Sequence, residues 1–256
     1  SDLAMTSSMP HLAARADGTV LAGGDATKSD VYEISLPPAP TAVRAIRLEV
    51  LPDESLPEHG PGMCSYEGPK GDFFLSEFEV RVGPKRLAIA AATASHDGQA
   101  FAGGKTTAAA TIDGEMSSGW TTNGQQGRPH AAVFRLAEAA PAGTALVVTM
   151  RFERHYACPL GCFRLAVTDA AHAEARGHTA AEESALARPA GERSAAERDI
   201  VLRRFLATAP EIAEPVKRIQ ALERQLRAGT RTAAGLGDHP GLTQAPDINR
   251  CRIRNQ

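Results

Sequence analysis

The feature that most constrains this chain is a change in the spacing of its apolar residues near Asp169. Between Thr19 and Thr168, apolar and polar residues alternate, and clusters of Gly, Pro, Asn and Asp interrupt the runs, which is typical of short strands joined by turns. After Asp169, Ala, Glu and Arg dominate, and apolar residues recur at the three- and four-residue spacing of helices. The sequence therefore predicts an all-β unit followed by helices.

Alternation within single segments predicts the individual strands. In residues 43–50, Ile46, Leu48 and Val50 fall on one face, while Arg47 and Glu49 fall on the other, so one face is expected in the core and one in water. The same pattern or a short apolar run occurs at 31–35, 73–82, 86–93, 131–137, 144–152 and 162–168. Together with the segment that begins at Thr19, these segments give about eight strands, enough for an antiparallel jelly-roll β-sandwich.

Two helices are predicted in the C-terminal part. The first covers residues 195–208, and the second carries an apolar stripe and ends at Gly229. The stripe consists of Ile212, Val216, Ile219, Leu222 and Leu226. We expect it to lie on the sandwich or on a second copy of the chain, which would make a homo-oligomer. The predicted organisation is a sandwich domain at 1–170, a helical extension at 171–229 and an irregular tail at 230–256.

Charge and hydropathy exclude some partners. The 256 residues carry 28 basic and 30 acidic side chains, so the formal charge of -2 gives no overall electrostatic reason to bind nucleic acid. No apolar run approaches the roughly 20 residues of a bilayer span. Neither nucleic acid nor a membrane span is expected. Because the first residue is Ser, we expect a fragment of a longer protein.

Three long runs resemble a known family. They cover residues 17–34, 45–80 and 109–168, and the helical part at 197–225 resembles the segment that follows them. These runs are similar to the middle region of large exported planctomycete-type proteins that carry a cytochrome c-type haem domain and flanking domains of unknown function. The resemblance implies an exported protein, in the periplasm or at the cell surface, in which this region contacts other domains.

That middle region is similar to the galactose-binding-like jelly roll of discoidin domains and family 32 carbohydrate-binding modules. In those modules a DGxxxTxW loop and an LSExEV strand hold a structural calcium and frame a sugar-binding end. The positions that match here are Asp113, Glu115, Ser118 (for the usual Thr) and Glu77 as calcium ligands, with Gly114 and Trp120 in the same loop. The alternative is an ordinary turn in which Trp120 packs in the core.

A set of polar and aromatic residues near predicted strand ends is the candidate sugar site. Arg, His and Asn make directional hydrogen bonds to hydroxyl groups, and an aromatic face stacks on sugar C–H groups. The set consists of Asn123, Arg128, His130, Arg154, His155 and Tyr156. The alternative is ordinary loop polarity. The expected ligand is a polysaccharide or oligosaccharide.

Four cysteines in an exported protein suggest disulfides. We expect at least one disulfide among Cys64, Cys158 and Cys162, and Cys251 in the tail is the least certain partner. The alternative is a zinc ion held by Cys64, His155, Cys158 and Cys162. The CxxCH motif of a c-type haem is absent from the sequence.

Enzyme motifs are also absent. The sequence contains no GxSxG, HExxH or GxxxxGK[ST] motif, and Gly103 to Thr106 only superficially resembles the end of a phosphate loop. The first hypothesis is thus a non-catalytic carbohydrate-binding module. The second is an architectural domain that docks the neighbouring haem and unknown-function domains, and the third is an enzyme with a metal- or His-centred site.

Overall fold

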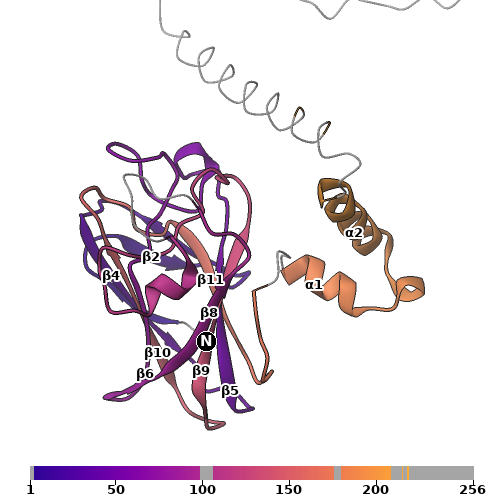
Figure 1. Cartoon of the computed structure of the whole chain (residues 1–256), viewed down its shortest axis with the longest axis horizontal. Helices are drawn as coiled ribbons and strands as arrows, with labels where there is room; N and C mark the ends of the chain where they lie inside the picture. Colours follow the sequence, from indigo (N-terminus) through magenta and orange to yellow (C-terminus); the bar gives the residue numbers. More distant parts are fainter. Residues whose placement is uncertain (1–2, 99–105, 176–179, 209–214, 216–217, 219–256) are drawn as a thin grey trace, which may run out of the picture. The chain divides into compact units, whose positions relative to one another are not determined.

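The first 183 residues form a unit made mainly of β-strands. The computed structural model describes residues 3–98, 106–175, 180–208, 215 and 218, and the chain divides into units at residues 1–183 and 184–256. In the described part of the first unit, all strands pair antiparallel in two sheets. The prediction of an antiparallel β-sandwich is confirmed to the extent that two antiparallel sheets are present (Figure 1).

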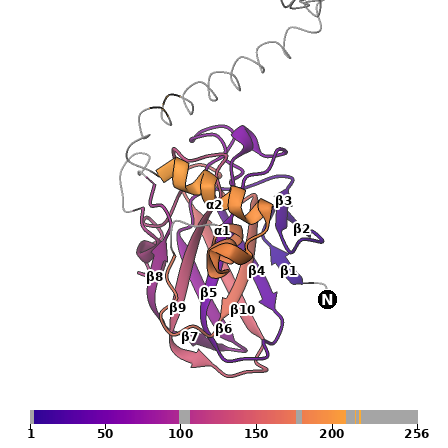
Figure 2. The same ribbon diagram turned by 90° about the vertical axis from the view of Figure 1, so that its right-hand side faces the viewer.

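The two sheets are called sheet A and sheet B. Sheet A has the order β1 (Ala4–Ser7), β4 (Ser29–Leu36), β10 (Leu146–Glu153), β6 (Glu77–Val82) and β7 (Lys85–Leu87). Sheet B has the order β2 (His11–Ala14), β3 (Val20–Gly23), β11 (Cys162–Thr168), β5 (Val43–Val50), β9 (His130–Ala140) and β8 (Ile89–Ala94). Figure 2 shows β5, β9 and β8 side by side in sheet B. Short 3₁₀ helices, η1 (Pro57–His59) and η2 (Ala108–Thr111), lie in the loops.

The structure contains strands that the sequence pattern did not predict. β1 and β2 lie within the predicted sandwich domain but precede Thr19, where the alternating pattern begins, and each is only four residues long. Their Ala, Met and Ser residues have little β propensity, so pairing with β4 and β3 determines their conformation. The predicted strand at 86–93 is split, because β7 pairs in sheet A and β8 pairs in sheet B.

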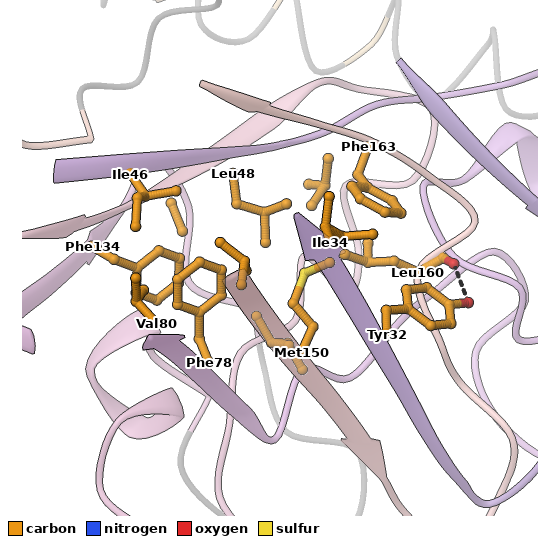
Figure 3. Packing of buried hydrophobic residues seen from close by; sticks show 14 of the residues in the cluster. Tyr32, Ile34, Ile46, Leu48, Phe78, Val80, Phe134, Met150, Leu160 and Phe163 are labelled. Atoms are coloured by element: carbon orange, nitrogen blue, oxygen red, sulfur yellow. Dashed lines mark hydrogen bonds between the residues drawn. The ribbon is translucent and has the colours of Figure 1, made fainter. Parts of the chain in front are cut away.

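The core lies between the two sheets and is built from their inward-facing side chains. Ile46 and Leu48 of β5 are fully buried, as the alternation predicts. Phe78 of β6 stacks on Phe134 of β9 across the sandwich, with ring centroids 3.6 Å apart (Figure 3). Tyr32 of β4 packs there too, and its hydroxyl donates a 2.9 Å hydrogen bond to the Leu160 carbonyl. These contacts join sheet A to sheet B.

The outer face of β5 differs from the sequence prediction. Glu49, expected in water, is only 4% exposed. Arg164 of β11 lies opposite it, with Nη2 2.6 Å from Glu49 Oε2, and Arg47 Nε lies 3.1 Å from Oε1. The prediction was wrong here because the two long arginine side chains cover the carboxylate while neutralising it.

The second unit is helical where it is described. α1 (Ala180–Ala187) crosses the boundary between the units, and η3 (Ala190–Glu192) and α2 (Ala195–Thr208) follow. α2 occupies the range predicted for the first helix. Ser194 caps it, since the Glu197 backbone N–H donates to Ser194 Oγ and the Ser194 N–H donates to Glu197 Oε2.

Several predictions for the C-terminal part fall outside the described residues. These are the apolar stripe from Ile212 to Leu226, the tail at 230–256 and Cys251. Within α2, Leu202, Phe205 and Leu206 are 52%, 61% and 44% exposed. Among the helices that the structure describes, none has the length and apolar character to cross a bilayer.

Candidate functional site

Four loops leave the sandwich at the same end, here called the loop end. Val50, the last residue of β5, pairs with His130, the first residue of β9, and also with Phe163 of β11. In sheet A, Glu153 at the end of β10 pairs with Ser29 at the start of β4. The loops at 24–28, 51–76, 106–129 and 154–161 therefore meet at the loop end (Figure 1). Most of the predicted site residues lie on them.

A buried carboxyl group lies beneath the loop end. Asp72 is 3% exposed, and Thr121 donates its hydroxyl hydrogen to Asp72 Oδ1. Burial raises the pKa of Asp72 from 3.8 to about 7, while the Thr121 hydrogen bond acts in the opposite direction. Sequence analysis missed Asp72, since an Asp beside a Gly is typical of an ordinary turn. Its burial depends on three loops that are distant in sequence.

Arg154, His155 and Tyr156 have different environments. The Arg154 guanidinium carbon lies 3.9 Å from the centroid of the Phe74 ring, and Nη1 lies 3.3 Å from the Ser117 carbonyl. The His155 side chain is exposed, and its ring packs edge-on against Tyr156 at 4.7 Å. Tyr156 is only 2% exposed. Contrary to expectation, Tyr156 is a packing residue and offers no open aromatic face.

Asn123, Arg128 and His130 form a second group on the 106–129 loop and the start of β9. The Asn123 amide oxygen accepts a 3.3 Å hydrogen bond from Gln126, and the Asn123 backbone N–H donates to Thr121 Oγ1. Arg128 is exposed. His130 is half-buried, with Nδ1 3.2 Å from Ser95 Oγ. Thr121, which contacts both Asp72 and Asn123, links this group to the buried carboxyl.

Tyr66 is the exposed aromatic residue that sequence analysis overlooked. Its side chain is 93% exposed. It lies two residues before Gly68, which is in close contact with the Tyr156 ring. In the same loop, Glu67 pairs with Lys28 at 3.4 Å, and the Lys28 carbonyl accepts a hydrogen bond from the Arg154 backbone. These contacts place the Tyr66 loop beside residues 154–156.

The predicted calcium ligands converge around Ser118. Ser118 Oγ lies 2.9 Å from both carboxylate oxygens of Asp113, 3.0 Å from the Glu115 carbonyl and 3.3 Å from the Ala110 carbonyl. One hydroxyl has a single hydrogen, so it cannot satisfy four acceptors at once. Glu115 takes part through its backbone, and its side chain is exposed. Backbone N–H groups donate to two of these acceptors, from Ser118 to the Glu115 carbonyl and from Glu115 to Asp113 Oδ1, so the loop gathers several oxygen atoms around one hydroxyl.

Glu77 of β6 joins this loop from the sheet. It is 1% exposed, and its Oε1 accepts a 2.8 Å hydrogen bond from the Gly114 backbone. Its Oε2 is buried without a hydrogen-bond partner. Burial and the nearby Asp113 carboxylate raise the pKa of Glu77. The unpaired Glu77 oxygen is of the type that Ca²⁺ prefers, but among the described residues Glu77, Asp113 and Glu115 do not form a group of three converging carboxylates.

Trp120 packs in the core. It is fully buried, its ring meets Phe73 edge-on at 5.2 Å, and its Nε1 donates to the His96 carbonyl at 2.8 Å. This is the structural role that sequence analysis gave as the alternative to a role in the calcium loop.

The three described cysteines are free thiols, and all are buried. Cys64 and Cys158 share a small apolar cluster with Phe74 and Tyr156, whereas Cys162 lies in β11. Among the described residues, no three His, Cys, Asp or Glu side chains converge as metal ligands. Of the expected zinc set of Cys64, His155, Cys158 and Cys162, the structure brings Cys64 and Cys158 into one cluster but does not bring three of the four together. The expected disulfide is not formed among these three residues.

Comparison of the chain with protein-family models, curated proteins and solved structures finds no match.

Proposed function

We propose that this chain is a non-catalytic carbohydrate-binding module of an exported multidomain protein. The sandwich is a jelly-roll variant that binds a polysaccharide or oligosaccharide at its loop end. A structural calcium ion holds the Asp113 loop, and the remaining surface contacts other domains of the parent protein.

The observation that carries the proposal is the exposed Tyr66 side chain beside residues 154–156. An aromatic face of 93% exposure is costly to leave in water and is the group that stacks on sugar C–H surfaces. His155 is exposed on the neighbouring loop and can hydrogen-bond to sugar hydroxyls. Arg154 is held in place by Phe74 and Ser117, so little side-chain entropy would be lost when it binds a ligand.

The test is a glycan array followed by calorimetry on the glycan that binds. Tyr66→Ala should weaken binding by about 5- to 150-fold, because a stacked ring contributes on the order of 1–3 kcal/mol. Tyr66→Phe keeps the face and should retain most of the affinity. His155→Ala should weaken binding with little change in melting temperature, because the side chain is exposed. Phe205→Ala, which removes an exposed aromatic residue from α2, is the matched control.

The calcium part of the proposal depends on Glu77, Asp113, Ser118 and the carbonyls of Ala110 and Glu115. Bound calcium would supply positive charge to Glu77 Oε2 and to the crowded acceptors around Ser118. The ion would then tie β6 to the Asp113 loop. Its role is stability, because these oxygens form a small cage rather than an extended sugar surface.

Thermal melts with calcium or with a chelator test this part. Calcium at 100 times its dissociation constant should stabilise the fold by about 2.7 kcal/mol. Glu77→Gln should abolish this shift and raise the melting temperature in chelator, because it removes a buried negative charge. Asp113→Ala should lose the shift as well. Glu79→Gln, which removes the same charge two residues along β6, should keep it.

The architectural role is the second candidate, and the exposed apolar side chains of α2 favour it. Leu202, Phe205 and Leu206 are surfaces that a neighbouring domain could cover. Two results together would favour the architectural role over carbohydrate binding. The intact chain would bind no glycan on a broad array, and deleting it would disturb only assembly of the parent protein.

A further inference from the structure

Cys64 and Cys158 each lie two residues from an isolated antiparallel bridge at the loop end. Gly62 forms an antiparallel bridge with Leu160. Its two hydrogen bonds run from the Gly161 N–H to the Pro61 carbonyl (2.7 Å) and from the Met63 N–H to the Pro159 carbonyl (3.0 Å). Counting on from this bridge pairs residue 63 with 159 and residue 64 with 158.

The position of the pair in the ladder suits a disulfide. Met63 and Pro159 occupy a hydrogen-bonded position with a single bond, because Pro159 has no N–H to donate, so 64 and 158 are at the next non-hydrogen-bonded position. Opposite residues at such a position have Cα atoms about 4.5 Å apart and side chains on the same face. Disulfides span Cα separations of roughly 4.4–6.8 Å.

The two thiols lie in the same buried cluster. Cys64 is fully buried, Cys158 is 2% exposed, and both belong to the cluster with Phe74 and Tyr156. The proximity of Cys64 contributes to the raised pKa of the Cys158 thiol, after the larger effect of burial. Cys162 has other neighbours, namely Asp53, Arg15 and Asp17.

We propose that Cys64 and Cys158 are the partners of a structural disulfide that joins the 51–76 loop to the 154–161 loop. The oxidant is a disulfide, either oxidised glutathione or the active site of a thiol-disulfide oxidoreductase. The two cysteine thiols lose two protons and two electrons and form one S–S bond, and the oxidant's disulfide is reduced to two thiols. Because both thiols are buried in the folded protein, the bond forms during folding, while the oxidant can still reach them.

The bond would hold the Tyr66 loop. Cys64 lies two residues before Tyr66, so fixing the Cys64 sulfur also anchors the start of that loop. The bond closes a loop of roughly 100 residues, and cross-linking a loop of that length raises the melting temperature by about 10 °C.

The test is to refold the full chain in a glutathione redox buffer and then alkylate it without reduction. Peptide mapping should find one peptide pair linked through Cys64 and Cys158, with Cys162 alkylated. The linked form should melt about 10 °C above the reduced form. Cys162→Ser should still form the bond, whereas Cys64→Ser and Cys158→Ser should each lose it.

Two results would overturn the proposal. One is full alkylation of Cys64 and Cys158 after refolding in oxidising buffer. The other is a bond that uses Cys162 or Cys251 in the wild-type chain. Cys64→Ala and Cys158→Ala provide a second pair of variants if the buried serine hydroxyls prevent folding. Glycan binding does not enter any of these readouts, so the disulfide stands or falls independently of the proposed function.

Discussion

Replacing Asp72 with Asn should remove a large part of the pH dependence of stability. The Asp72 carboxyl is 3% exposed, and burial raises its pKa from 3.8 to about 7. The folded protein therefore holds this proton more tightly than the unfolded chain does. Its contribution to stability is complete below pH 3.8 and is lost as the pH rises through about 7.

The magnitude follows from the two pKa values. Each pKa unit corresponds to 1.36 kcal/mol, so the full contribution is about 4 kcal/mol, of which about 3 kcal/mol is lost between pH 5 and pH 8. Asp72→Asn keeps an oxygen that can accept the Thr121 hydrogen bond but has no charge to bury. The wild type should thus lose about 3 kcal/mol relative to the variant over this pH range.

Urea unfolding at pH 5, 6, 7 and 8 measures this difference, with Trp120 fluorescence as the probe. Trp120 is the single tryptophan and is fully buried in the first unit, so it reports on the sandwich. Thr121→Val provides a second arm. It removes the hydroxyl that favours the ionised Asp72 carboxylate. The fall in stability with pH should therefore occur at higher pH in this variant than in the wild type. A stability difference between wild type and Asp72→Asn that stays constant from pH 5 to pH 8 would refute the reasoning.

Three further predictions concern single contacts. The Arg15 guanidinium lowers the pKa of Asp53 to about 2, so Asp53→Asn should cost about 1 kcal/mol at pH 7 and almost nothing at pH 2, in urea titrations at the two pH values. Phe134→Ala removes a fully buried ring and should cost about 3–5 kcal/mol in the same assay, and a cost below 1 kcal/mol would contradict the observed packing. Gly62→Ala would place a Cβ atom 1.9 Å from the Asp72 carbonyl oxygen and should lower the melting temperature, and a melting temperature equal to that of the wild type would show that residues 62 and 72 are not packed together as described.

The strands with strong alternation were predictable from sequence because their environment repeats every two residues. β5 has the predicted range, and its inward residues Ile46, Leu48 and Val50 are all fully buried. Short strands carry too few residues for such a pattern. β1 and β2 depend on hydrogen bonds to β4 and β3, and no local feature of four residues can specify those partners.

The candidate site was predictable only in part. The Asp113 loop and Glu77 were both singled out through a resemblance, and their role as calcium ligands stays a prediction. The burial of Tyr156, the exposure of Tyr66 and the buried Asp72 were not predictable. Each depends on which loops meet at the loop end, and the residues concerned are far apart in the chain.

By itself the sequence determined the class of fold, because period-two alternation cannot bury a helix face, and the spacing after Asp169 cannot bury a strand face. Only the tertiary structure decided that Cys64 and Cys158 share one buried cluster, that the Asp72 carboxyl is buried and that the Tyr66 ring is exposed to solvent. Those properties follow from contacts between segments as distant as Gly62 and Leu160, which form an isolated antiparallel bridge. Local patterns carry no information about such pairings, since desolvation is a property of the assembled loops.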